Sequence, residues 1–160
     1  MTIDLKELLF QDMQMDAHAM TDRVIVVTGA GQGIGLQTAR AFAFLGAKVI
    51  LAELSEQGKT AEELIQAEGG TARFIKTDVS DTDSVANLHR EVHQSFGSAD
   101  ILINNAIFIK EGRVLEMTPE TWDRTIAVNL RGTFLTCRAF LAEMLEMDRG
   151  LIINMVSSSF

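Results

Sequence analysis

The sequence predicts an α/β fold, an open sheet of parallel strands with helices packed on both of its faces. From Arg23 onward, short apolar runs alternate with stretches of helical periodicity, and continuous apolar runs are typical of strands that helices cover on both sides. A glycine-rich turn joins the first apolar run directly to the first helical stretch, as in strand–turn–helix units. Right-handed crossovers then predict one doubly wound sheet with the strand order 3-2-1-4-5, without an internal linker or second domain.

Each strand of this sheet has its own apolar run. The first is almost wholly β-branched, which favours a strand over a helix. The five predicted strands are residues 24–27, 48–52, 72–76, 101–103 and 151–156.

The helices are predicted from periodicity together with caps and stops. Ser55, Asp81 or Thr82, and Thr118 are residue types that cap helix N-termini, and Pro119 suits a first turn. Glycines at 46 and 69 are expected to end the helices before them. The predicted helices are 33–45, from Ser55 to residue 68, from 81 or 82 to 96, and 118–147, the last with a bend near Gly132.

Composition excludes several classes of function. The 160 residues carry a formal net charge of −8, which argues against nucleic acid or an anionic membrane as partner. Cys137 is the only cysteine, so we expect neither an intrachain disulfide nor a cysteine metal site. No apolar run is long enough to cross a bilayer, and the acidic start resembles no targeting peptide. Cytoplasm is the expected location.

Residues 1–20 form a predicted N-terminal extension, separate from the domain at 21–160. Leu5, Leu8, Leu9 and Met13 have helical spacing. Both a short amphipathic helix and a frayed tail fit this pattern.

The turn at residues 28–35 predicts an anion site. Its sequence is Thr28-Gly29-Ala30-Gly31-Gln32-Gly33-Ile34-Gly35. Glycines let backbone approach a pyrophosphate closely, and the helix that follows presents free N–H groups and a positive dipole end. A tight turn with positive φ would also select glycine, but the position between strand and helix favours the phosphate interpretation.

The spacing of Gly29, Gly33 and Gly35 behind Thr28 resembles that of the short-chain dehydrogenase/reductase family. Four more motifs continue the resemblance in order: Asp78-Val79, Asn104-Asn105-Ala106, Val128-Asn129-Leu130-Arg131-Gly132, and Ile152-Ile153-Asn154-Met155-Val156-Ser157-Ser158.

This resemblance implies a Rossmann domain that binds a nicotinamide dinucleotide and transfers hydride between a small alcohol or carbonyl substrate and the cofactor. By the same resemblance, Ser157 would polarise the substrate carbonyl, and the backbone of Asn129 would hold a water in a proton relay. Ser157 is preferred to Ser158 and Ser159 because it stands three positions after Asn154. The implied cofactor-binding residues are Thr28, Gly29, Gly31, Gln32, Gly33, Ile34, Gly35, Glu53, Asp78, Val79, Asn105 and Ala106.

Charge at the end of the second strand favours NAD over NADP. Glu53 can accept hydrogen bonds from the ribose 2′-hydroxyl and repel a 2′-phosphate. NADP-binding relatives usually offer a basic residue in the glycine turn or just after this strand, where the chain has Gln32 and Leu54.

Two departures from the family pattern affect the functional expectation. Ile107 stands where the family usually has glycine, and the chain contains no tyrosine, whereas the family's Y-x-x-x-K motif lies beyond the serine. We therefore expect a domain that is truncated after its fifth strand, and we expect it to be inactive alone and prone to self-association. The full-length enzyme of this family type is expected to be a homo-oligomer. The alternative is a short protein that binds a dinucleotide or a partner without catalysis. A methyltransferase is disfavoured by Thr28, Asn104-Asn105-Ala106 and Asn129.

His89 and His93 are spaced i, i+4 on a predicted helix, a spacing that can bind a metal. No third ligand is evident in the sequence, so we expect two solvated histidines and no metal site.

Overall fold

Five parallel strands form one sheet in the order β3-β2-β1-β4-β5, which confirms the predicted order. They are β1 (Val24–Thr28), β2 (Lys48–Glu53), β3 (Thr71–Lys76), β4 (Ile101–Asn104) and β5 (Leu151–Asn154). The computed structural model describes Asp16 and residues 18–157, so the expectation for residues 5–13 lies outside the described residues. The fifth strand ends two residues before the predicted end.

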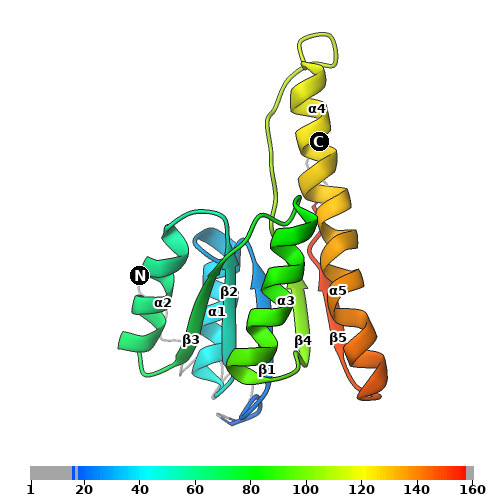
Figure 1. The fold of residues 1–160 in the computed structure, drawn as a ribbon. Coiled ribbons are helices and arrows are strands. Elements are labelled where there is room, and N and C mark those ends of the chain that lie inside the picture. Colours follow the sequence, from blue (N-terminus) through cyan, green and yellow to red (C-terminus); the bar gives the residue numbers. More distant parts are fainter. Residues whose placement is uncertain (1–15, 17, 158–160) are drawn as a thin grey trace.

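The helices lie on both faces of the sheet (Figure 1). They are α1 (Gly33–Phe44), α2 (Gln57–Ala67), α3 (Thr82–Phe96), α4 (Pro119–Ile126), the π-helical segment η2 (Ala127–Gly132) and α5 (Thr133–Glu146).

Two details of the helices differ from the predictions. Ser55 does not cap α2, because its hydroxyl donates to Glu53 Oε1 at 3.0 Å and the helix begins after Glu56 without a side-chain cap. Near Gly132, where a bend was predicted, the structure has a six-residue π segment that joins α4 to α5.

Alternation along the strands divides the core into two layers. On β1, Ile25 and Val27 pack in a cluster with residues of α1 and α2, among them Ala39 and Ile65. Val24 and Val26 instead pack in a cluster with residues of α3 and α5, such as Leu88 and Phe140. Successive side chains of a strand point to opposite faces, so a strand between two helical layers must be apolar at every position. This accounts for the continuous apolar runs of the sequence.

Strand register brings four loops to one edge of the sheet. Thr28 of β1 lies opposite Ala52 of β2, and Val27 lies opposite Ile103 of β4. On the other side, Glu53 lies opposite Lys76 of β3. The residues that follow these strands therefore emerge side by side at the carboxyl edge, where open α/β sheets bind their ligands.

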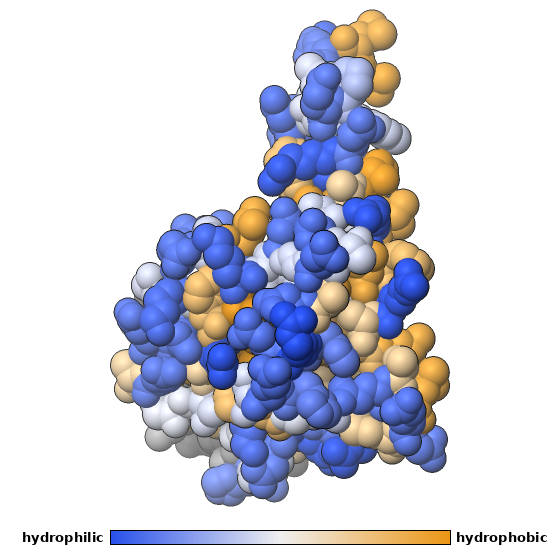
Figure 2. All heavy atoms as spheres, viewed as in Figure 1, coloured by the Kyte–Doolittle hydropathy of each residue, from blue (hydrophilic) through white to orange (hydrophobic). Residues whose placement is uncertain are grey.

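The helix formed by α4, η2 and α5 extends past the sheet (Figure 1), and α4 contains no buried residue. Large apolar side chains are exposed along this helix, and β5 at the sheet edge is also partly exposed. Figure 2 shows apolar surface along this side of the molecule. The exposed residues on the helix are Trp122, Ile126, Leu130, Phe134, Leu141 and Leu145.

Candidate functional site

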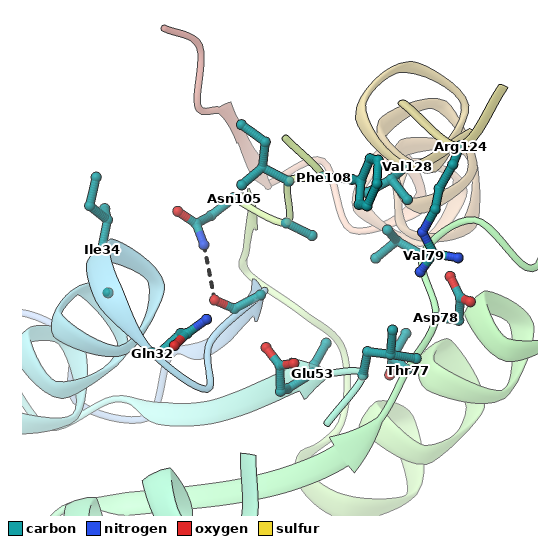
Figure 3. Close-up of a pocket in the computed structure, with 16 residues that line it drawn as sticks. Gln32, Ile34, Glu53, Thr77, Asp78, Val79, Asn105, Phe108, Arg124 and Val128 are labelled. Carbon is teal, nitrogen blue, oxygen red and sulfur yellow. Dashed lines mark hydrogen bonds between the residues drawn. The ribbon is translucent and has the colours of Figure 1, made fainter. Parts of the chain in front are cut away.

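A cavity of about 480 Å³ opens at the carboxyl edge of the sheet, beside the glycine turn (Figure 3). Its walls come from the turn after β1, the ends of β2 and β3, the loop after β4, and the helix of α4 and η2. The lining residues are Gly29, Gln32, Gly33, Ile34, Ala52, Glu53, Leu54, Thr77, Asp78, Val79, Asn105, Ala106, Ile107, Phe108, Arg124 and Val128.

Two glycines of the turn are required by close backbone contacts. Gly29 has φ 64°, and a Cβ built there would lie 2.8 Å from the Cα of Ala106. A Cβ on Gly35 would lie 2.2 Å from the carbonyl oxygen of Gly29. Any side chain at these positions would push the start of α1 away from the loop after β4, so both glycines hold the turn against that loop.

Thr28 and Asn105 tie the glycine turn to the loop after β4. The buried Thr28 hydroxyl accepts hydrogen bonds from the backbone N–H of Asn105 and of Ala106, each at 3.0 Å. In return, the Asn105 side-chain amide donates to the carbonyls of Thr28 and Gly29, at 3.0 and 3.1 Å. Together these four bonds fix one wall of the cavity.

The Glu53 carboxylate is held at the floor of the cavity by backbone donors. Its Oε2 accepts from the N–H of Gly31 at 3.2 Å, and its Oε1 accepts from the N–H of Ser55 at 3.0 Å. A Cβ on Gly31 would lie 2.8 Å from Glu53 Cγ, so the glycine makes room for the acid. The carboxylate lines the cavity with its orientation set before any ligand arrives.

The loop after β3 forms the next wall. Asp78 Oδ1 accepts from the backbone N–H of Ser80 at 2.9 Å and from its hydroxyl at 2.6 Å, which folds the loop into a turn. Val79 packs against Gly132 of η2, where a Cβ would lie 2.9 Å from Val79 Cγ2. Gly132 thus permits the close approach of the long helix to this wall.

Asn129, expected to act through its backbone, uses its side chain to hold the loop that carries Phe108. Its Oδ1 accepts from the Phe108 N–H at 2.8 Å, and its Nδ2 donates to the Phe108 carbonyl at 2.9 Å. Asn129 lies in the π segment, a type of segment found frequently at functional sites.

The cavity brings together nine of the predicted site residues and leaves five outside its lining. Thr28, Gly31 and Gly35 lie behind it as supports, Asn129 contacts the loop of Phe108, and Ser157 is exposed on the segment that follows β5. The nine that line it are Gly29, Gln32, Gly33, Ile34, Glu53, Asp78, Val79, Asn105 and Ala106.

Sequence reasoning did not assign Phe108, Arg124 or Val128 to the site. Arg124 and Val128 are spaced i, i+4 before Asn129, a helical spacing that could have placed both on one face. Ile107, the residue in place of the family's glycine, also lines the cavity. It is not among the described residues with positive φ, so the backbone accommodates isoleucine without strain.

A second cluster joins α3 to α5 away from the cavity. Glu143 Oε1 lies 2.8 Å from His93 Nδ1, and its Oε2 lies 3.4 Å from His89 Nε2. Burial opposes ionisation of Glu143, but hydrogen bonds from Ser98 and His93 and the charges of both histidines outweigh it and hold the pKa of Glu143 below its usual range.

Glu143 is thus the partner that the sequence did not reveal for this histidine pair. Among Asp16 and residues 18–157, no group of three or more His, Cys, Asp or Glu side chains is arranged to hold a metal ion. In the same described part of the chain, no helix has the length and apolar character to cross a membrane.

The fold and the glycine turn define a doubly wound α/β protein with a cavity at the end of its first strand. The chain belongs to the short-chain dehydrogenase family, whose model matches residues 23–159. The five motifs that suggested this family lie within or next to the matched region.

Named relatives support the same assignment. An uncharacterized oxidoreductase of Thermotoga maritima is 41% identical over 137 residues, which are 85% of this chain and 54% of that protein. D-threitol dehydrogenase of Mycolicibacterium smegmatis is 36% identical over 93% of this chain and 58% of its own length. The crystal structure of a metagenomic short-chain oxidoreductase in complex with NADP matches with a TM-score of 0.83 and 39% identity, covering 88% of this chain and 64% of that one.

The chain therefore spans about half the length of the curated relatives that it matches, 54% of the Thermotoga protein and 58% of the threitol dehydrogenase.

Proposed function

We propose that this chain forms the dinucleotide-binding part of an NAD-dependent oxidoreductase that interconverts an alcohol and a carbonyl compound. The observation that carries the proposal is the fixed Glu53 carboxylate in a cavity that also contains the glycine turn. The nicotinamide ring, when bound, supplies the hydride acceptor or donor. The residues of this chain bind and orient it.

The start of α1 supports binding of the pyrophosphate. Gln32 precedes the helix without making a side-chain capping bond, and the first turn of α1 contains no acidic residue. The N–H groups of that turn are therefore left for an external acceptor, and the helix dipole favours an anion there. The hydrogen bonds of Thr28 and Asn105 hold the glycine turn close to the loop after β4. We therefore expect the phosphates to contact the backbone of the turn and not side chains.

Glu53 supports the choice of NAD. Its carboxylate, oriented by Gly31 and Ser55, can accept from a ribose 2′-hydroxyl, whereas a 2′-phosphate would place two like charges together. Neighbouring Gln32 and Leu54 offer no cation. The metagenomic relative was crystallised with NADP, which makes this preference the first property to measure.

The other walls have proposed roles that follow from the family's motifs. Asp78 and Val79 would face the adenine, and Asn105 with Ala106 would border the nicotinamide side. Ser157 would polarise the substrate carbonyl, and the backbone of Asn129 would hold a water. The chain contains no tyrosine, so the general acid/base of the family is not among these residues.

That observation favours a second candidate function for the 160 residues taken alone, which is dinucleotide binding without turnover. Both candidates use the same cavity, and both predict the binding behaviour below.

Titration of the purified chain with NADH and NADPH tests the proposal through the emission of the bound reduced cofactor. We expect NADH to bind roughly tenfold more tightly, a difference of about 1.4 kcal/mol, because only NADPH brings a 2′-phosphate to Glu53. Glu53→Gln keeps an acceptor but removes the charge, so it should narrow the difference mainly by improving NADPH binding. Glu56→Gln is the matched control, since Glu56 is an exposed carboxylate paired with Lys76 at 3.0 Å.

Equal affinities in the wild-type chain would contradict the NAD preference. If the Glu53→Gln variant kept the wild-type difference between NADH and NADPH affinity, a group other than Glu53 would be responsible for distinguishing the 2′-hydroxyl from the 2′-phosphate.

A further inference from the structure

Arg124 is the one basic residue among the described residues that line the cavity, and its role has no explanation in the family motifs identified above. The acidic residues of that lining are Glu53 and Asp78. Arg124 lies on α4, which contains no buried residue, so packing alone does not explain why its guanidinium points into the cavity.

The guanidinium is positioned by an aromatic ring and not by an acid. Its central carbon lies 5.1 Å from the ring centroid of Phe108, within the range of a cation–π contact. Within the described part of the chain, the Arg124 side chain forms no ion pair or hydrogen bond, although its backbone carbonyl accepts a bond within the helix. The backbone of Phe108 is held in turn by the Asn129 side chain, which accepts from the Phe108 N–H and donates to the Phe108 carbonyl. The planar cation is therefore held in place while its hydrogen-bonding groups stay free.

The surroundings of Arg124 favour a flat, aromatic ligand. Figure 3 shows the guanidinium beside Asp78 and Val79, away from the glycine turn. Val79 and Val128 supply apolar walls here. Asp78 is occupied with Ser80 on one carboxylate oxygen, yet its negative charge remains next to the slot. This part of the cavity therefore combines apolar walls, a planar cation and a nearby carboxylate. It suits a neutral ring better than a second phosphate, because the carboxylate would repel the phosphate.

We infer that Arg124 is a positioning residue for the purine ring of the cofactor, which it contacts through the flat face of its guanidinium. The inference rests on the proposed dinucleotide-binding function and adds a residue to it. Stacking on a ring requires the planar guanidinium, which lysine lacks. The affinity for any ligand that contains adenine should therefore depend on Arg124, and the affinity for the nicotinamide half should not.

Competition against bound NADH tests this inference with the two halves of the cofactor, AMP and nicotinamide mononucleotide, and with ADP-ribose. Arg124→Ala should weaken AMP and ADP-ribose by about 5- to 30-fold, the size expected of a desolvated cation–π contact. Nicotinamide mononucleotide should bind as before, which also shows that the variant is folded. Arg124→Lys should give an intermediate loss, and Arg138→Ala, on the exposed side of α5, should have no effect.

Three results would overturn the inference, and they differ from one another. Equal affinity of wild-type and Arg124→Ala for AMP would remove the purine contact while leaving the proposed function intact. A loss of NADPH affinity in Arg124→Ala, measured by the cofactor titration described under the proposed function, with no loss for AMP or ADP-ribose, would assign Arg124 to the 2′-phosphate. A wild-type chain that binds neither ADP-ribose nor NADH would contradict the proposed function itself, and the inference with it.

Discussion

At the scale of single residues, one hydroxyl does much to shape the site. Thr28 is 1% exposed, and its Oγ1 accepts from two backbone N–H groups of the neighbouring loop. The family resemblance marked Thr28 as a binding residue, but the structure gives it a place behind the cavity. Its contribution is to join β1 to the loop after β4, so that the glycine turn and Asn105 face the same space.

Thr28→Val should destabilise the chain more than Thr28→Ser. Valine keeps the shape but leaves the partly buried N–H groups of Asn105 and Ala106 without their acceptor, at a cost of about 1 kcal/mol for each. Serine keeps the hydroxyl and loses one methyl, worth about 0.8 kcal/mol. Urea unfolding followed by circular dichroism measures both. A valine variant as stable as the serine variant would show that these bonds contribute little.

Arg124 and Phe108 are site residues that could not be predicted from the sequence. The glycines and Asp78 come just after strands and Glu53 ends one, so strand prediction alone places them at one edge of the sheet. Phe108 lies in a loop and Arg124 on a helix that extends past the sheet, and neither position is fixed by a local pattern. Their contact depends on Asn129, which holds Phe108 across a gap in sequence that no periodicity reveals.

At the scale of elements, the central strands β1, β2 and β4 were predicted closely because they are buried on both faces and therefore apolar in continuous runs, a pattern visible in the sequence. The edge strand β3 instead alternates between buried and more exposed residues. The end of β2 and the start of α2 were less predictable. Ser55 has the usual chemistry of a cap, but the carboxylate of Glu53 takes its hydroxyl instead. The π segment of residues 127–132 was expected only as a bend, because glycine at 132 indicates flexibility and not the type of helix.

The contact of α3 with α5 predicts a specific pH dependence of stability. Folding lowers the pKa of Glu143, so the unfolded chain binds a proton there more readily. The stabilisation is therefore complete above the unfolded pKa, near 4.3, and is lost as pH falls through the lower folded pKa.

Unfolding free energies of wild-type and Glu143→Gln, measured between pH 3 and 6, test this dependence. The wild-type chain should be the more stable at pH 6, and the gap should close toward pH 3. Glu146→Gln, one turn further along the helix and exposed, serves as control. A gap that does not change with pH would mean that the Glu143 charge is not what holds α3 to α5.

At the scale of the whole molecule, apolar surface is concentrated on one side. The long helix exposes Phe134 and Leu145 at 58% and 70%, and β5 at the edge of the sheet exposes Leu151 at 50%. An uncovered apolar edge strand is a template for pairing with another chain. The large net charge of −8 opposes association only over the screening length of the buffer.

We therefore propose that the 160-residue chain self-associates, with a mass that increases with concentration in light scattering after size exclusion. Leu151→Lys should reduce this association, since a lysine on an edge strand blocks strand pairing. Val114→Lys is the matched control, because Val114 is 88% exposed in a loop away from the edge. A monodisperse monomer at all concentrations would show that the exposed apolar surface of the long helix and β5 does not mediate association.

Hydrogen–deuterium exchange of the chain with and without NADH tests most directly the central claim that a nicotinamide dinucleotide binds at the carboxyl edge of the sheet. Bound NADH should slow exchange in four segments at the carboxyl edge that line or border the cavity, residues 29–36, 53–55, 77–80 and 105–108. The contact of α3 with α5 around Glu143 should exchange as before. Protection at that contact with none at the glycine turn would contradict the account, as would the absence of any protection at saturating NADH.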